Sequence, residues 1–469
     1  MFDGTFSNIT TNYIIMKAII SKFLYLLFSI SAMAQTGHVM QGVGAVNMSM
    51  GGASTAQPLD ISGALYWNPA VISNFNNNIL KLDVGLFFSS PELSSSLPAG
   101  MLGPGAPGVS GVTKDDRGVS IMPNIAYLWS NKGSKHTFGA SAFGISGFGV
   151  TFPEESNNPF SPSFNPLEDS NPINYPQEAM GFGHIESDYM LLQIGLSYAY
   201  EITDKLSFGV QPNINYAALE LMPNPTASPT MAGYPSTDKA SSIGFGAQFG
   251  LFYDSGYGLK LGASYKTTQK FSKFKFDNTY LDDSSSNNEF QMDYPAIFSL
   301  GLGYSTGDVD LALDFRRVDY ENTSGFSETG WTQTASVAGF GWENISIVSA
   351  GLQYKGINKL PLRFGYTYSS NPIPDEVAFF NIPATAIIKH AYQFGLSYMV
   401  NGNWNIDAVY HYGDSDGSTT GKILSPFAAS PSNPLGAIPG SSVSYNMTTS
   451  MVMVGISYTF NNKQVENNN

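Results

Sequence analysis

Residues 391–412 decide the fold class, and they read Ala-Tyr-Gln-Phe-Gly-Leu-Ser-Tyr-Met-Val-Asn-Gly-Asn-Trp-Asn-Ile-Asp-Ala-Val-Tyr-His-Tyr. Apolar residues occupy every second position from Tyr392 to Tyr398 and again from Trp404 to Tyr412. A period of two is typical of a β-strand with one apolar and one polar face. Asn401 and Gly402 tolerate the positive φ angles of a tight turn. The stretch predicts two antiparallel strands, although a soluble β-sandwich would show the same alternation.

Segments with this alternation recur along the chain, and we count about fourteen of them. The first is expected at Ile79–Ser89 and the last at Ser450–Phe460. The seventh and eighth are expected at Gly258–Phe276 and Glu289–Ser305. Aromatic residues gather near the strand ends on the apolar side, as in an interfacial girdle.

The connections between these segments alternate in length. Tight turns such as Thr306-Gly307 are followed by long loops rich in Pro, Ser and Asn, such as Thr151–Glu186. Bacterial outer-membrane barrels have this arrangement, with short periplasmic turns and long outer loops. The chain is therefore predicted to be an all-β, 14-stranded antiparallel transmembrane β-barrel spanning residues 79–460. A polar tail, residues 461–469, follows the final aromatic residue.

The composition narrows the function class. Charged residues make up 12% of the 469 residues and aromatic residues 13%, which disfavours both disorder and an ordinary soluble enzyme. Cysteine is absent, so no disulfide framework or Cys-ligated metal is possible. The net charge of −14 argues against a nucleic-acid partner, because phosphate binding needs a basic face.

The first 34 residues carry an export signal. A positive region from Lys17 to Lys22 precedes an apolar core from Phe23 to Ile30 and a small-x-small cleavage site before Gln35. The apolar run is too short to span a bilayer, which needs about 20 residues. We therefore expect residues 1–34 to be a signal peptide with an upstream extension. Met1 and Met16 both stay open as the true start.

Residues 35–78 precede the first predicted strand and are expected to form a small N-terminal hatch inside the lumen. Gly42–Ala70 is rich in small residues and poor in charge. A fourteen-stranded barrel is too wide to be filled by its own side chains, so a separate segment must fill it. Asp310, Asp314 and Arg316 share one face of their strand, and we expect such inward charges to hold the wall and anchor the plug rather than bind substrate.

The third strand contains three glycines in seven residues, Phe143 to Gly149. Interior glycines weaken a strand and often mark a bulge or kink. Two interpretations stay open: close packing against the plug, or a kink that opens a gap in the wall for lateral exit of an apolar solute.

Catalytic and cofactor chemistry has little support. No two of the five histidines have metal-ligand spacing, and Gly144-Ile145-Ser146-Gly147 does not complete a nucleophile elbow because Phe148 follows. Asp414-Ser415-Asp416-Gly417 resembles a calcium loop only faintly and is better read as a solvated turn. We expect no catalytic residue, no metal and no cofactor.

The chain resembles the outer-membrane long-chain fatty acid transporter family, FadL, which includes toluene and xylene channels. The most specific match is the hatch motif, in which Gly51-Gly52 is followed by Asn68-Pro69-Ala70. Two weaker matches are the Pro-x-Pro loop at Asn371–Asp375 and Phe138–Ser141, which leads into the glycine-rich strand.

The resemblance implies that hydrophobic ligands are captured between outer loops, pass the hatch and leave laterally at the third strand. The kink residues would be Phe143, Gly144, Ser146 and Gly147. Apolar candidates for outer-loop capture are Leu221, Met222, Met231, Tyr234 and Tyr280.

These features together predict passive uptake of hydrophobic small molecules, most of all long-chain fatty acids, by a monomer in outer-membrane lipid. The alternative is an outer-membrane hydrolase or a structural barrel without transport. A hydrolase would need a Ser-His pair, and His390 and His411 are the nearest candidates at the outer rim. A general porin is a third interpretation, disfavoured because a plug stops bulk diffusion.

Overall fold

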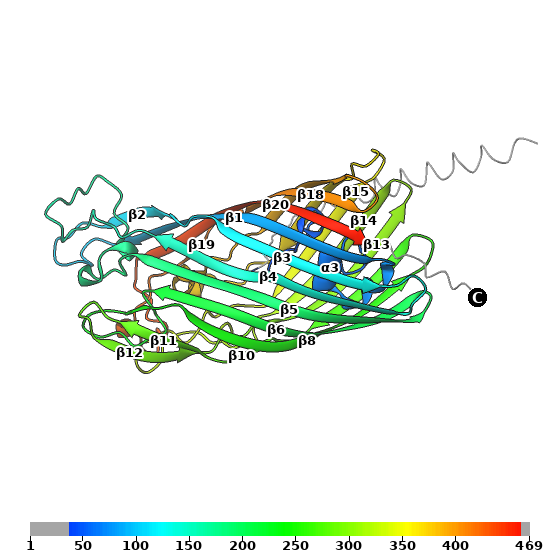
Figure 1. Cartoon of the computed structure of the whole chain (residues 1–469). Coiled ribbons are helices and arrows are strands. Elements are labelled where there is room, and N and C mark those ends of the chain that lie inside the picture. The colour runs from blue at the N-terminus through cyan, green and yellow to red at the C-terminus, as the bar shows by residue number, and fades with distance from the viewer. Residues whose placement is uncertain (1–36, 461–469) are drawn as a thin grey trace, which may run out of the picture. The chain divides into compact units, whose positions relative to one another are not determined.

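The computed structural model describes residues 37–460, and fourteen of its strands form the wall of a barrel (Figure 1). The predicted signal peptide and the polar tail lie outside the described residues. The wall strands are β1 (Asn78–Leu97), β3 (Ser120–Ser130), β4 (His136–Phe152), β5 (Ile185–Thr203), β6 (Leu206–Met222), β8 (Ala240–Asp254), β9 (Leu259–Lys266), β13 (Ala296–Thr306), β14 (Val309–Asp319), β15 (Ile345–Tyr354), β16 (Leu362–Ser369), β17 (His390–Met399), β18 (Trp404–Asp414) and β20 (Ser442–Phe460).

Every wall strand pairs in antiparallel fashion with its neighbours, and β20 closes the barrel on β1, where Asn78 pairs with Phe460. The strands alternate between buried inward residues and exposed apolar outward residues. On β1, Leu82, Val84 and Leu86 are each more than two-fifths exposed although they are apolar. Exposed apolar side chains on a closed wall face lipid, so the predicted barrel class is confirmed.

Aromatic residues ring the end of the barrel that carries the short turns. Trp129, Tyr200, Tyr253, Tyr304 and Trp404 are all exposed there, between 37% and 47%. Indole and phenol rings favour the membrane–water boundary, because one part of each ring system is apolar and another is polar. This girdle agrees with the pattern expected from the sequence.

Several predicted strand boundaries were wrong. β1 and β20 are both longer than expected, because they continue to pair with each other out to Ser96 and Ser442, beyond the alternating apolar segments. The expected strand Gly258–Phe276 is broken after Lys266, and β10 (Lys270–Phe271) and β11 (Phe274–Thr279) follow separately. The expected start at Glu289 belongs instead to β12 (Ser285–Phe290), which forms a hairpin with β11.

The segment before β1 lies in the lumen. It contains α2 (Ala45–Ser49), α3 (Ile61–Trp67) and the 3-10 helix η1 (Pro69–Asn74), and nearly all of its side chains are buried. Figure 1 shows α3 inside the barrel, toward the end with the short turns. None of the described helices is long and apolar enough to cross a membrane.

The opposite end carries the long loops. β2 (Val109–Lys114) extends the wall beside β1, and β19 (Thr419–Gly421) extends it beside β20. β7 (Ser236–Thr237) joins β11 and β12 in a small separate sheet. The remaining outer elements are the 3-10 helices η2 (Pro172–Asn174), η3 (Gln177–Ala179), η4 (Asp375–Ala384) and η5 (Pro426–Ala428).

Candidate functional site

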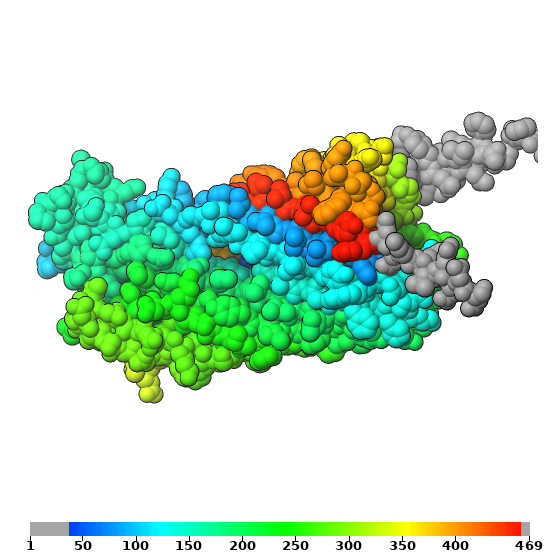
Figure 2. Space-filling model, in the orientation of Figure 1, coloured from blue at the N-terminus to red at the C-terminus, as the bar shows by residue number. Residues whose placement is uncertain are grey.

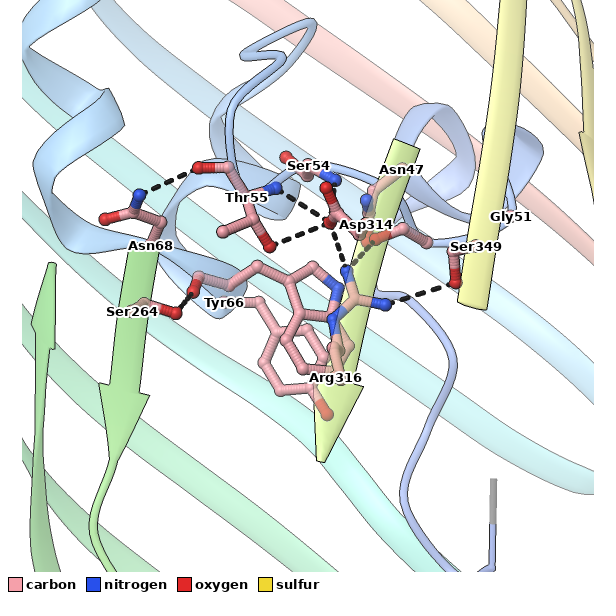
Figure 3. A network of polar contacts seen from close by, with 12 residues as sticks. Asn47, Gly51, Ser54, Thr55, Tyr66, Asn68, Ser264, Asp314, Arg316 and Ser349 are labelled. Carbon is pink, nitrogen blue, oxygen red and sulfur yellow. Dashed lines mark hydrogen bonds and ion pairs between the residues drawn. The ribbon is translucent and has the colours of Figure 1, made fainter. Parts of the chain in front are cut away.

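The lumenal segment is held to the wall through Asp314 of β14. One oxygen of this carboxylate, Oδ2, accepts hydrogen bonds from the backbone N–H groups of Ser54 and Thr55, at 2.8 and 2.9 Å. The Thr55 hydroxyl donates to the same oxygen at 2.8 Å. Figure 3 shows these contacts converging on the carboxylate. Hydrogen bonds to an ionised acceptor are about twice as strong as neutral ones.

Arg316 lies two residues further along β14 and points into the same network (Figure 3). Its Nη2 lies 2.5 Å from Asp314 Oδ2 and donates to the Gly52 carbonyl at 2.7 Å. The guanidinium carbon lies 3.6 Å from the centre of the Trp67 ring, a cation–π geometry. Two inward charges therefore pair with each other and anchor the lumenal segment, as expected from their shared face.

Asn68 connects the lumenal segment to itself and to the wall. Its Nδ2 donates to the Thr55 carbonyl at 2.8 Å and to the Leu251 carbonyl of β8 at 3.0 Å. Its Oδ1 accepts the N–H of Ala70 at 3.0 Å, which caps η1, and Pro69 is the first residue of that helix. A proline needs no hydrogen-bond donor there, so Asn68-Pro69-Ala70 is a helix start fastened to the barrel.

A buried lysine ties the segment to the opposite wall. Lys81 of β1 lies 3.0 Å from Asp60 and 2.9 Å from Asp407 of β18. Asp60 caps α3 through the N–H of Gly63, and Asp83 accepts the N–H of Ala45 at the start of α2. Buried charges are stable when they are paired and hydrogen-bonded, as these are.

Gly51 and Gly52 lie at positions where the backbone leaves no room for a Cβ atom. Both have positive φ angles, 66° and 76°. A Cβ on Gly52 would lie 1.7 Å from the Gln41 carbonyl oxygen, and one on Gly51 would lie 2.7 Å from the Tyr366 carbonyl oxygen of β16. The Gly-Gly pair therefore lets the segment turn sharply against the wall.

The glycine-rich stretch of β4 contains a β-bulge. Its pairing with β5 shifts register between Gly144 and Ser146, so Ile145 is the extra residue. Ile145 and Ser146 are both buried, which breaks the alternation of the strand. From the inside, Val39 pairs with Ser146, and the Ser146 hydroxyl donates to the His38 carbonyl at 2.9 Å.

Beyond the bulge, β4 separates from β3. The β3–β4 ladder runs from Ser130 only as far as the pair of Asn124 with Phe143, while β3 continues along β1 to Ser120. No ladder joins Ser120–Pro123 to the facing part of β4 among the described pairings. This strand therefore packs against the lumenal segment and also departs from its neighbour β3.

A cavity of about 530 Å³ lies at this separation. Its lining joins lipid-facing residues of the wall, such as Ile121 and Met190, to lumenal residues such as His38 and Gln41. Figure 2 shows a small hollow in this face of the barrel, between the cyan β3 and the blue-green β4. Three of the four expected kink residues, Gly144, Ser146 and Gly147, line the cavity, whereas Phe143 is buried and is not part of the lining.

The lining is mostly apolar and rich in methionine. Six methionines contribute to it: Met40, Met48, Met122, Met190, Met447 and Met451. Methionine is flexible and polarisable and adapts to ligands of different shape. Among the described lining residues, the one arginine is Arg117, and it is paired with Asp188 at 2.6 Å.

His38 is a lining residue that sequence reasoning did not single out. Its ring stacks on Phe326 at 4.7 Å, and its Nδ1 lies 2.9 Å from the Tyr320 hydroxyl. Its Nε2 has no hydrogen-bond partner among the described residues. Burial lowers the pKa of His38 from 6.5 to about 3, so the ring is neutral at pH 7. A neutral ring is compatible with an apolar solute.

The five predicted capture residues are not brought together at one pocket. Leu221 is buried and Met222 half-buried at the end of β6, whereas Met231 is fully exposed on its loop. Tyr234 and Tyr280 each donate a hydroxyl hydrogen bond to a loop carbonyl, of Ala335 and Ser228.

A small outer apolar pocket of about 40 Å³ has a different lining. It is formed by Phe182, Ile185, Pro223, Pro225, Val337, Phe379, Phe380, Ile382 and Pro383. Four of these residues, Phe379, Phe380, Ile382 and Pro383, belong to η4, the helix that follows the Pro-x-Pro loop. The Pro-x-Pro motif was the sequence signal closest to this pocket.

The two histidines considered for a hydrolase Ser-His pair, His390 and His411, have partners other than serine. His411 Nδ1 lies 3.1 Å from Gln393 Nε2, and His390 Nδ1 lies 2.7 Å from the Tyr366 hydroxyl. Among the described residues, no group of three or more His, Asp or Glu side chains could hold a metal ion, and this includes Asp414 and Asp416.

Comparisons with known proteins agree with this architecture. The family model described as "Outer membrane protein transport protein (OMPP1/FadL/TodX)" matches residues 175–461. No curated protein matches the chain by sequence.

Solved structures match the fold over almost the whole chain. A Pseudomonas aeruginosa FadL homologue has a TM-score of 0.67 at 14% identity, covering 91% of this chain and 100% of its own. The Pseudomonas putida toluene transporter TodX has a TM-score of 0.61 at 18% identity, covering 90% and 99%. The Ralstonia pickettii toluene transporter TbuX has a TM-score of 0.58 at 16% identity, covering 90% and 99%.

Proposed function

The chain belongs to the OMPP1/FadL/TodX family of outer-membrane transport proteins, and on this premise we propose that it is a channel for the passive uptake of hydrophobic compounds. The observation that carries the proposal is the methionine-rich cavity at the separation of β3 and β4, whose lining joins the lumen to the lipid-facing side of the wall. The lumenal segment serves as a hatch, residues 35–78, that blocks straight passage along the barrel.

The proposed route has three parts. Solute is captured among the outer loops, where η4 lines an apolar pocket. Of the five capture residues expected from the sequence, Leu221, Met222, Met231, Tyr234 and Tyr280, the fully exposed Met231 offers further apolar surface. It moves past the hatch into the cavity. It leaves laterally into the membrane beside Phe143, Gly144, Ser146 and Gly147, because an apolar solute is more stable in lipid than in water.

Long-chain fatty acids are the first ligand class that we propose. A cavity of about 530 Å³ lies within the range of roughly 300–1,000 Å³ that suits drug-sized ligands, so it accepts a molecule larger than a single aromatic ring. Monoaromatic hydrocarbons are the second class, because they are the stated solutes of TodX and CymD, two proteins of the same fold.

The charge of the cavity lining bears on which ligand class is preferred, fatty acids or hydrocarbons. Arg117 is already paired with Asp188, so a fatty acid carboxylate would meet no unpaired cation among the described lining residues. An unpaired charge in an apolar site is costly, which favours the uncharged acid or a hydrocarbon.

Uptake by bacterial cells tests the proposal. Cells that carry the protein in their outer membrane should accumulate labelled oleate or labelled toluene faster than cells with an empty vector. The ratio of the two rates identifies the preferred class. Equal rates with and without the protein, for both solutes, would contradict the proposal and favour a structural barrel.

A further inference from the structure

The separation between β3 and β4 has a defined outer boundary. Residues 115–119, which connect β2 to β3, leave the side of β1 and reach β4. The Thr151 N–H of β4 donates to Asp115 Oδ1 at 2.5 Å, and the Asp116 N–H donates to the Thr151 carbonyl at 2.8 Å. We call the space enclosed by Ser120–Pro123, Phe143–Gly149 and this crossing the window.

The window is long enough for a solute. The stretch of β4 from Phe143 to Gly149 spans roughly 20 Å at about 3.3 Å per residue. Its inner limit is a ladder pair, Asn124 with Phe143, and is fixed by backbone hydrogen bonds. Its outer limit has one backbone hydrogen bond, from the Asp116 N–H to the Thr151 carbonyl, and otherwise depends on side chains.

Arg117 crosses β4 at the outer limit. Its guanidinium reaches over the strand to β5, where Nη1 donates to the Ser187 carbonyl at 2.7 Å and Nη2 lies 2.6 Å from Asp188 Oδ1. The crossing is possible because residue 149 is glycine. A Cβ at Gly149 would lie 1.6 Å from Arg117 Nη1.

Asp188 is also held from its other side. Lys239, just before β8, lies 2.5 Å from Asp188 Oδ2 and 3.5 Å from Glu220 of β6. The carboxylate is therefore fixed in place as the anchor for Arg117. The pair connects the β2–β3 connection to β5, across the part of β4 that does not ladder with β3.

We propose that the Arg117–Asp188 pair is the clamp that sets the width of the window, and so the largest cross-section of solute that can leave. The proposal rests on lateral exit as the proposed function. Each side chain of the pair is about one-quarter exposed, so solvent screens the pair only in part. The pair can therefore hold the outer end of the window and still break when a solute passes. Arg117 thereby acts as a specificity-determining residue that excludes by size.

A distance measurement tests the clamp without any transport. The chain has no cysteine, so single cysteines at Ile121 and Met190 can carry spin labels on the two sides of the window. Both side chains face outward and are exposed, 67% and 48%. In the Arg117→Gln background, the distance distribution between the labels should broaden toward longer distances.

The matched control removes a positive charge close by. Lys114 is exposed and pairs with Glu92 on the neighbouring strand, away from the window. Lys114→Gln should leave the distance distribution unchanged. A distribution in Arg117→Gln that equals the one in Lys114→Gln would overturn the clamp.

Transport supplies the second readout. In cells, the uptake of pyrene relative to toluene should rise by about two- to fivefold in Arg117→Gln, the range by which a partly exposed ion pair can shift an equilibrium. Gly149→Ala should act in the same direction, because its methyl group displaces the guanidinium while both charges remain. An unchanged ratio with active toluene uptake contradicts the clamp alone, whereas absent uptake of both solutes in the wild type contradicts the proposed function.

Discussion

Asp314 and Thr55, which are 259 positions apart in sequence, are joined by two hydrogen bonds. The backbone N–H and the hydroxyl of Thr55 both donate to Oδ2 of Asp314. The first links the wall to the backbone of the hatch, and the second links it to a side chain. A wall carboxylate therefore holds the hatch at a turn of its backbone, beside the Arg316 that neutralises it.

Replacing Asp314 with Asn should loosen the hatch. The substitution keeps the shape but leaves Arg316 without its counter-charge, and breaking a buried pair in this way costs about 3–5 kcal/mol. We expect faster proteolysis of the hatch and larger ion conductance in planar bilayers. Asp310→Asn is the control, because Asp310 is buried on the same strand and pairs with Lys355 and Gln353 of the wall. Equal conductance in the two variants would contradict the anchoring role.

Replacing Asn68 with Ala should impair uptake and leave barrel assembly intact. Asn68 is part of the hatch, so the wall ladders do not depend on it, but three hydrogen bonds are lost. Each net loss is about 1 kcal/mol, with more for any carbonyl left unpaired. Heat-modified mobility on gels reports assembly, and labelled oleate reports uptake. Normal uptake in this variant would mean that the motif does not gate.

The docking of the N-terminal residues should weaken in acid. His38 has a pKa of about 3 when buried and about 6.5 when released, so the released state binds more protons between these values. Stability of the docked state is full above pH 6.5 and falls as pH drops toward 3, by about 1.4 kcal/mol per pH unit at most. Protease sensitivity of residues near His38 should rise over this window in the wild type. His38→Gln should remove that part of the pH dependence, and an identical profile in both proteins would refute the assignment.

The wall was predictable because strand alternation is a local signal. A period of two shows in any short window of sequence, as in residues 391–412, and the inward face of Asp314 and Arg316 followed from it. The ends of β1 and β20 could not be found this way. Their outer halves are serine-rich and gain stability from pairing with each other.

The hatch contacts and the window depend on residues far apart in sequence. His38 meets Tyr320 at a separation of 282 residues, and no local pattern encodes that contact. The glycine-rich stretch signalled a bulge but not which neighbour would be lost. Apolar loop residues such as Met231 were weak signals, because a loop residue can equally point into solvent, as this one does.

Uptake in a Gly147→Trp variant tests whether solute leaves laterally beside Gly147. Gly147 is exposed on β4 and lines the cavity, so an indole there fills the window without touching the hatch anchors. Gly147→Ala is the small-residue control at the same position, since its Cβ lies 3.0 Å from the Tyr189 carbonyl oxygen and adds little bulk. We expect near-wild-type uptake of labelled oleate and toluene in Gly147→Ala and loss of both in Gly147→Trp. Unchanged uptake in a correctly assembled Gly147→Trp barrel would contradict lateral exit and favour a route along the barrel axis.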